Sequence, residues 1–366
     1  MGQVFLMQRA AKQLRRIGQL ALLSLVLGAL AWASKPAKRL PTEVGPELLL
    51  DGGRKLDYQG SFESQQEVKP KRGFWTKLLD IAIGEPEYHT LIAPYGIVTD
   101  SRGRIIVSDP GAYGVHIFDF AQQKYKFLSR KDKDKDGMLL PQCVAVDAQD
   151  NIYVTDSEAG KIFVFNADGK YQRAIGSLKG GEGFFKRPTG IAVDSAAQRI
   201  YVTDTLRDKI FVLDMQGSVL ETIGKGGAGN GEFNYPTELR LNGPDLVVVD
   251  AMNFRVQVLD RSGQFRYAIG ALGNKPGEMF RPKGIGFDSE GHLYVVDGLQ
   301  GTVQVFNSEG RLLYYFGNGT GAGEFQMPSG LQIDKNDRIY VVDSYNRRIQ
   351  VFQYSAIAKQ ASGGVH

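Results

Sequence analysis

Six aspartates recur at intervals of 46 to 48 residues, each at the end of a short apolar run: Asp109, Asp156, Asp204, Asp250, Asp297 and Asp343. A ring of carboxylates could bind a metal ion. An aspartate at a strand end more commonly caps the following loop or pairs with a nearby arginine, as Asp343 could with Arg347 or Arg348. We therefore expect these aspartates to be structural.

Residues 132–137, Asp-Lys-Asp-Lys-Asp-Gly, imitate the first half of a calcium-binding loop. The twelfth position of such a loop requires a glutamate and is Cys143 here, so an EF-hand is excluded. Asp132, Asp134 and Asp136 remain candidates for a looser surface calcium site, although a solvated charged loop is the preferred interpretation. No other cofactor is expected.

The histidines and the single cysteine give little support for a catalytic site. The four histidines fall at different positions of the repeat described below, so they do not predict a three-histidine zinc site: His89, His116, His292 and His366. Cys143 is the only cysteine and cannot form an internal disulfide. We interpret it as a small buried residue rather than a nucleophile, and we assign no catalytic residue.

The first 33 residues read as a targeting segment. A basic stretch precedes the 17 uncharged residues 17–33, and its cations are Arg9, Lys12, Arg15 and Arg16. The small residues Ala31 and Ala33 favour cleavage before Ser34, which would export the chain to the periplasm. The alternative is an uncleaved inner-membrane anchor with the rest of the chain outside the cytoplasm, for which 17 residues is short.

The charge balance argues against a nucleic-acid partner. The chain has 44 basic and 40 acidic residues, and the targeting segment holds four of the basic ones and none of the acidic ones. The remainder is formally neutral, whereas a domain that binds a duplex normally keeps a basic excess.

The elements that position all these residues form a repeat. A proline precedes each unit at a matching offset: Pro94, Pro141, Pro188, Pro236, Pro282 and Pro328. Each unit reads as four short strands separated by turn residues, as in 190–194, 293–297, 303–306 and 312–316. Four-stranded units with a period in the forties predict an all-β fold, a six-bladed β-propeller of antiparallel blades.

The last unit supplies only three strands, so the ring needs a fourth from elsewhere. Residues 53–60 have two glycines seven apart, the spacing seen around the fourth strands of other units. We expect this segment to complete the last blade beside Ile349–Phe352 and to hide a sheet edge. The domain plan is then a leader (1–33), a linker (34–52), the propeller (53–354) and a flexible tail (355–366).

Three motifs resemble the NHL-repeat family: Pro-Thr-Gly-Ile-Ala-Val-Asp at 188–194, Ile-Tyr-Val-Val-Asp-Ser-Tyr-Asn-Arg-Arg-Ile-Gln-Val-Phe at 339–352, and Gly-x-Gly-x-Gly-Glu-Phe-x-x-Pro at 319–328. The resemblance covers roughly residues 53–354. The arrangement of a leader followed by a propeller is similar to that of exported bacterial NHL-repeat proteins. The resemblance implies the propeller fold and leaves function open, because the family includes lyases, RNA binders, sensors and scaffolds.

Propellers commonly bind partners on the face that holds the loops entering strand one. At the second residue after the proline, four blades have glycine, but Cys143 and Glu238 break the rule, which marks a candidate site. Glu238 could contact a cationic ligand or pair with Lys283 or Arg255, and we prefer the ion pair. The other binding candidates at this channel mouth are Tyr95, Gln142, Thr189, Lys283, Ser329, Arg187, Arg207, Arg255, Arg281 and Arg347.

Residues 63–93 are the one large departure from the repeat. Within them, residues 74–83 read as a short amphipathic helix bounded by Gly73 and Gly84. It either caps the propeller or docks a partner or membrane through Phe74, Trp75, Leu78 and Leu79.

These patterns favour a non-enzymatic, exported or membrane-tethered propeller, expected to be monomeric, that binds a protein or peptide through its loop face. The alternatives are a metal-dependent lyase or hydrolase at the channel mouth, resembling the amidating lyases, and a carbohydrate-binding or sensor module.

Overall fold

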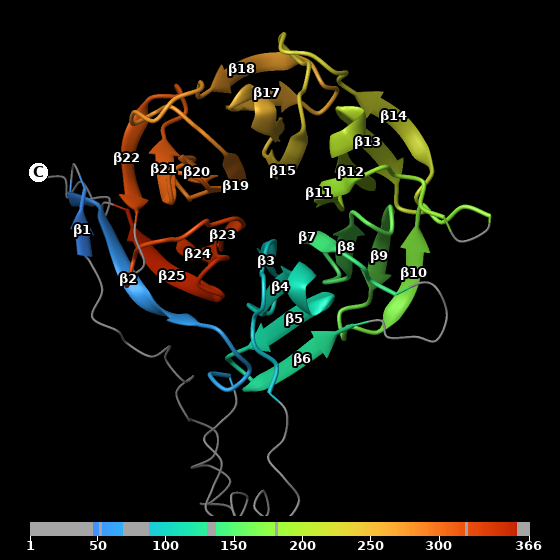
Figure 1. Ribbon diagram of the computed structural model, residues 1–366, viewed down its shortest axis with the longest axis horizontal. Coiled ribbons are helices and arrows are strands. Elements are labelled where there is room, and N and C mark those ends of the chain that lie inside the picture. Colours follow the sequence, from blue (N-terminus) through green and yellow to red (C-terminus); the bar gives the residue numbers. More distant parts are fainter. Residues whose placement is uncertain are drawn as a thin grey trace, which may run out of the picture. The chain divides into compact units, whose positions relative to one another are not determined.

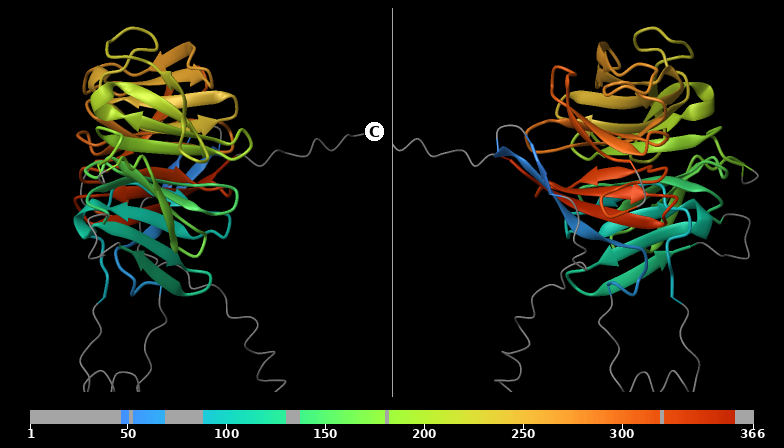
Figure 2. Two further views of the ribbon diagram at one scale, coloured as in Figure 1. Left: turned by 90° about the vertical axis from the view of Figure 1, so that its right-hand side faces the viewer. Right: turned by 60° about the vertical axis from the view of Figure 1, so that its left-hand side comes forward.

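The structure, a computed structural model, describes residues 47–50, 53–68, 88–129, 137–179, 182–318 and 321–356. Within them six antiparallel sheets are arranged as blades around a central axis, with the first strands β3, β7, β11, β15, β19 and β23 innermost (Figure 1). This confirms the predicted six-bladed propeller. Figure 2 shows the same blades from the side, with β2 running beside the C-terminal strand β25.

The strands follow in chain order. Blade 1 contains β3 (Ile97–Thr99), β4 (Ile105–Asp109), β5 (Gly114–Asp119) and β6 (Lys124–Leu128); blade 2 contains β7 (Pro141–Val146), β8 (Ile152–Asp156), β9 (Lys161–Phe165) and β10 (Tyr171–Ile175). Blade 3 contains β11 (Pro188–Asp194), β12 (Arg199–Asp204), β13 (Lys209–Asp214) and β14 (Val219–Ile223); blade 4 contains β15 (Pro236–Asn242), β16 (Asp245–Asp250), β17 (Arg255–Asp260) and β18 (Phe265–Ile269). Blade 5 contains β19 (Pro282–Phe287), β20 (Leu293–Asp297), β21 (Thr302–Phe306) and β22 (Leu312–Gly317). Blade 6 contains β23 (Leu331–Ile333), β24 (Arg338–Asp343), β25 (Arg348–Ser355), β2 (Lys55–Phe62) and β1 (Glu47–Leu49).

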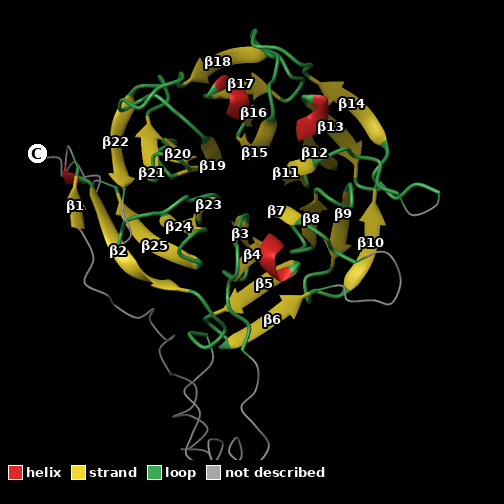
Figure 3. Ribbon diagram, in the orientation of Figure 1, coloured by secondary structure: helices red, strands yellow, loops and turns green. Residues whose placement is uncertain are grey.

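Three short 3-10 turns follow the second strand of blades 1, 3 and 4 (Figure 3). These are η2 (Pro110–Ala112), η3 (Thr205–Arg207) and η4 (Ala251–Asn253). Each ends at a residue in the left-handed conformation, which turns the chain into the third strand.

The core consists of six clusters of buried side chains, each shared by two neighbouring blades. Because a blade is covered on both faces, its second strand is buried throughout, as β8 is from Ile152 to Asp156. The fourth strand lies outermost and alternates between exposed and covered side chains, as in β6. This difference in burial explains why the sequence shows continuous apolar runs in the second strands and alternation in the fourth strands.

The ring closes through the N-terminal segment, as expected. β2 pairs antiparallel with β25, with Tyr58 opposite Phe352 and Phe62 opposite Ile349. Phe62 also packs into the cluster between blades 6 and 1, so it joins the first and last units of the chain. β1 extends this blade to five strands, within a region that the sequence assigned to the linker.

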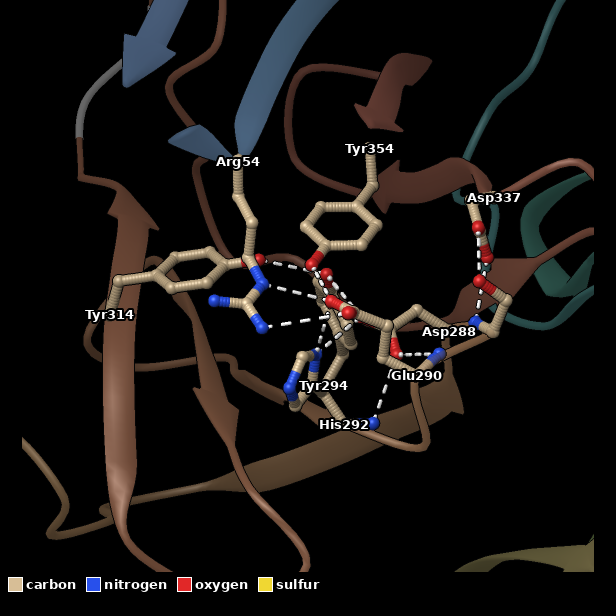
Figure 4. Close-up of polar contacts among 9 residues, drawn as sticks. Arg54, Asp288, Glu290, His292, Tyr294, Tyr314, Asp337 and Tyr354 are labelled. Atoms are coloured by element: carbon tan, nitrogen blue, oxygen red, sulfur yellow. Dashed lines mark hydrogen bonds and ion pairs between the residues drawn. The ribbon is translucent and has the colours of Figure 1, made fainter. Parts of the chain in front are cut away.

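A polar network ties the two closing strands, β2 and β25, to blade 5 (Figure 4). The Arg54 guanidinium lies 2.9 Å from the Glu290 carboxylate, which also accepts a hydrogen bond from the Tyr354 hydroxyl. Arg54 adjoins β2 and Tyr354 lies in β25, whereas Glu290 lies in the turn between β19 and β20. Glu290 therefore couples the closing strands to the neighbouring blade.

Several sequence predictions concern residues that the structure does not describe. These are the targeting segment (1–33), the amphipathic helix with Phe74, Trp75, Leu78 and Leu79, and the calcium candidates Asp132, Asp134 and Asp136. Among the described residues, the structure contains no helix of the length and apolar character needed to span a membrane.

Candidate functional site

The repeated aspartates cap the loops that lead into the first strands. Asp109 accepts hydrogen bonds from the backbone N–H groups of Ile92 and Ala93, and Asp297 does so from Phe280 and Arg281. The other four accept corresponding main-chain bonds in their own blades. All six are buried and fully engaged in this way, as the sequence suggested.

Three arginines of the loop face pair with these aspartates. We define the loop face as the surface formed by the connections from fourth to first strands and from second to third strands. The pairs are Arg207–Asp204 at 3.2 Å, Arg255–Asp250 at 2.8 Å and Arg348–Asp343 at 2.8 Å. Arg207 and Arg255, expected at the channel mouth, therefore stabilise the loops of this face, and Arg348 rather than Arg347 is the partner of Asp343.

Two further predicted site residues link neighbouring blades. The Thr189 hydroxyl contacts the Thr203 and Thr205 hydroxyls at 2.8 and 2.7 Å, and the Thr205 hydroxyl donates to the Pro236 carbonyl of the next blade. The Ser329 hydroxyl donates to the Tyr95 carbonyl at 2.9 Å, across the junction of blades 6 and 1. Thr189 and Ser329 are buried, so we assign them to holding the ring together.

Glu238 lies at the ring axis and has two partners. Its carboxylate lies 2.9 Å from the Arg240 guanidinium and 3.1 Å from the Cys143 sulfur. The expected pairing with Lys283 or Arg255 is wrong: Arg240 lies two residues along the same strand and reaches Glu238 first, while Arg255 is held by Asp250. The two residues that break the glycine rule therefore contact each other.

Arg240 extends from blade 4 across the axis. Its guanidinium lies 3.4 Å from the Ile97 carbonyl of β3 and 3.5 Å from the Leu331 carbonyl of β23. It therefore joins the innermost strands of blades 4, 1 and 6. Nothing in the repeat pattern predicted this role, because the side chains at this position in other blades are uncharged.

The Cys143 thiol is unsuited to nucleophilic chemistry. Burial raises its pKa well above the ordinary value, and the adjacent Glu238 charge and hydrogen bond raise it further. The thiol therefore stays protonated and donates to the carboxylate.

Three cations surround the loop-side end of the axis, where the sequence placed the channel mouth. Arg187 and Arg281 directly precede the prolines that begin β11 and β19, and Lys283 follows Pro282. The Lys283 ammonium lies 5.6 Å from the centre of the Tyr95 ring, a cation–π contact. Burial and the Arg281 charge lower the pKa of Lys283 to about 8. We name Arg187, Arg281 and Lys283 the axis cations.

Exposed apolar side chains encircle these cations on the loop face. Two residues after the repeated aspartate, four blades place Leu206, Met252, Leu299 and Tyr345, which are 44 to 64% exposed. The loops leading into the first strands add Ile92, Leu139, Tyr235, Phe280 and Met327, which are 39 to 48% exposed. We name these nine residues the apolar ring. Aligning the six repeats at the position two after the aspartate would have revealed four of them.

The three described histidines do not meet at one site, although His89 and His116 both pack against Tyr125 and Phe127. His116 lies 3.3 Å from Asp109 and contacts the Tyr125 hydroxyl, His292 lies 2.8 Å from Asp288 on the opposite face, and His89 stacks on an aromatic ring of blade 1. In the part of the chain that the structure describes, no group of three or more histidine, cysteine, aspartate or glutamate side chains is placed to hold a metal ion. Of the remaining candidates, Gln142 is buried, and Arg347 is exposed and forms no ion pair with any residue that the structure describes.

Sequence comparison links the chain to a known family. Residues 135–200, 192–252 and 287–360 match the DUF5128 family, described as 6-bladed beta-propeller. No curated protein matches the sequence.

Solved structures share the fold at low sequence identity. Virginiamycin B lyase from Staphylococcus aureus is 15% identical with a TM-score of 0.52, and the match covers 73% of this chain and 85% of that one. A gluconolactonase from Xanthomonas campestris is 16% identical with a TM-score of 0.57, covering 88% and 98%. An auxiliary nutrient binding protein from Bacteroides thetaiotaomicron is 13% identical with a TM-score of 0.56, covering 73% and 70%. At these identities the likeness concerns the fold alone.

Proposed function

We propose that this chain, which belongs to the DUF5128 family of 6-bladed beta-propellers, binds a protein or peptide partner on its loop face. The observation that carries the proposal is the apolar ring. Nine large apolar side chains at repeated loop positions are 39 to 64% exposed on one face. Exposed apolar side chains gathered on one face often mark an interaction site, and aromatic, methionine and arginine side chains are enriched in such sites.

The rigidity of the surrounding loops supports binding. Each loop leading into a first strand is fixed by hydrogen bonds to a buried aspartate, and three of the loops between second and third strands are also held by an arginine. A preorganised surface loses little conformational entropy when a partner binds. The repeat thus presents side chains that differ between blades on a scaffold that is common to all of them.

The basic and apolar order of residues 1–33 supports placing this binding face outside the cytoplasm, on an exported or membrane-anchored protein. Two of the fold relatives named above are enzymes, which supports the alternative of a metal-dependent lyase or hydrolase at the axis. Metal analysis of the purified protein separates the two functions: stoichiometric bound zinc or calcium would favour the enzyme.

The binding proposal is tested with a random peptide display library selected on the immobilised full-length protein. Selected peptides are then titrated against the variants Leu299→Asp and Tyr345→Asp. The matched controls are Leu313→Asp and Tyr315→Asp on the outer strand β22, where the same residue types are 45% and 53% exposed. We expect the loop-face variants to weaken binding at least about tenfold, as for central interface residues, and the controls to leave it unchanged. Equal effects from both pairs, at unchanged melting temperatures, would overturn the proposal.

A further inference from the structure

We propose that the axis cations bind a carboxylate of the partner, so that the loop face recognises an acidic residue flanked by apolar ones. This inference rests on the proposed function and specifies the chemistry of the same site. It assigns Arg187, Arg281 and Lys283 to the carboxylate and the apolar ring to its neighbours.

The first argument is that the axis cations make no ion pair among the described residues. Arg207, Arg255 and Arg348 on the same face each pair with a buried aspartate. None of the three axis cations makes an ion pair with any described residue, although Lys283 contacts the Tyr95 ring. The three paired arginines therefore stabilise the fold, whereas the axis cations remain available to a ligand.

The second argument is convergence. The axis cations come from blades 3 and 5, yet they act on one point, the Tyr95 side chain of blade 1. Arg187 and Arg281 occupy matching positions, directly before the prolines that begin the innermost strands β11 and β19. Burial, Cys143 and Glu238 raise the pKa of the Tyr95 hydroxyl, whereas the positive charges of Arg281 and Arg187 lower it, which is consistent with this placement. Lys283 lies over the same ring at 5.6 Å from its centre.

The third argument is that the nearby acids are already engaged: Asp297 accepts backbone hydrogen bonds from Phe280 and Arg281. The Glu238 carboxylate is buried at the axis between Arg240 and the Cys143 thiol, so it does not balance the axis cations. Burial and the Arg281 charge disfavour the charged form of Lys283, and the Asp297 charge offsets them only in part, because the pKa of Lys283 is still lowered. An anion placed between these groups would relieve the repulsion and form charge-assisted hydrogen bonds.

The surroundings favour a peptide carboxylate over a free anion. The apolar ring surrounds the cations, so a ligand that fills the face must present apolar groups on either side of its charge. A glutamate or aspartate between apolar residues does so. Two guanidinium groups suit the planar oxygen pair of a carboxylate.

The test uses the peptides selected on the full-length protein. We expect aspartate and glutamate to be enriched at least threefold over the library, and a Glu→Gln change in a peptide to weaken binding about tenfold, the usual effect of losing a charged hydrogen bond. Arg281→Gln and Lys283→Gln should each weaken the acidic peptide severalfold but leave its Gln version unchanged. Lys335→Gln, an exposed lysine on the opposite face, is the matched control and should change neither.

Four results would contradict the inference. Loop-face binders without acidic enrichment, or peptides bound equally as Glu and Gln versions, would refute it while leaving the proposed function intact. Inorganic phosphate could displace the peptides from the wild type but not from Lys283→Gln. That result, with no preference for acidic residues among the peptides, would assign the cations to a phosphate group instead. A library that yields no loop-face binder would contradict the proposed function, and the inference with it.

Discussion

The Cys143 sulfur lies 3.1 Å from a Glu238 carboxylate oxygen, although β11 of blade 3 separates their strands. Gly190 of that strand makes the contact possible. A Cβ atom on Gly190 would lie 2.8 Å from the Glu238 Cα, so no side chain fits between the two inner strands. The glycine rule at this position therefore reflects the close approach of neighbouring first strands, and the two exceptions fill the space at the axis.

Gly190→Ala should destabilise the protein by about 1–3 kcal/mol, the usual cost of overpacking, because the new methyl group meets backbone that cannot move freely. Chemical denaturation followed by far-UV circular dichroism measures this change in the free energy of unfolding. Gly226→Ala is the matched control: its Cβ would meet only an ordinary contact at 3.4 Å, and we expect a change within about 0.5 kcal/mol. Equal effects at both positions would contradict the close packing of the inner strands.

Glu238→Leu should destabilise the protein by about 3–5 kcal/mol, because it leaves the Arg240 charge without a carboxylate near the ring axis. The double variant Glu238→Leu/Arg240→Leu should recover much of that loss, since replacing both members of a buried ion pair by apolar side chains is often nearly neutral. Urea denaturation of Glu238→Leu, Arg240→Leu and the double variant measures these changes in the free energy of unfolding. If the double variant is as unstable as the sum of the single ones, the pair is not the coupled unit described above.

The Cys143 thiol should not react with Ellman's reagent at pH 8 in the folded protein, because burial and Glu238 hold its pKa well above the ordinary value. One equivalent should react after unfolding in denaturant, which serves as the internal control. Rapid reaction in the native state would show that the thiol is accessible and partly ionised.

Glu290 should make the ring closure sensitive to acid. Hydrogen bonds from Arg54 and Tyr354 lower the pKa of its carboxyl group below the ordinary 4.5. The stabilisation is therefore complete above the unfolded value near 4.5 and is lost as pH falls through the lower folded value. Glu290→Gln should reduce stability at pH 7 by about 1 kcal/mol or less, as expected for a partly solvated pair, and flatten its decline below pH 5.

The control for that series is Glu309→Gln, which removes an exposed pair with Arg311 whose side chains are 66% and 73% exposed. It should change neither the stability nor its pH dependence, because such surface pairs contribute little. Thermal melts between pH 3 and 7 compare the three proteins. Identical pH profiles for the Glu290 variant and the wild type would show that Glu290 does not stabilise the ring closure.

The repeat made the ring, its blade count and the closing strand predictable. The spacing of apolar runs and turn glycines fixes which segments pair, and the missing fourth strand left one candidate. β1 was not predicted because residues 47–49 follow no repeat: they pair only because β2 offers an open edge.

The axis was predictable only in part. The repeat alignment identified Cys143 and Glu238 as exceptions, but not that they meet across Gly190, since the contact depends on the curvature of the ring. It also could not show that Arg240 turns toward Glu238, whereas Arg207 and Arg255 turn toward their own aspartates. Which of several arginines remains unpaired is decided by side-chain geometry, which a sequence does not contain.

Hydrogen exchange of the full-length protein with and without a selected peptide tests most directly whether the loop face is the binding surface. We predict slower exchange in the loops before Pro188 and Pro282 and around Leu299 and Tyr345, with no change in the outer strands β14, β18 and β22. Protection of the outer strands, with the loops unchanged, would contradict the account.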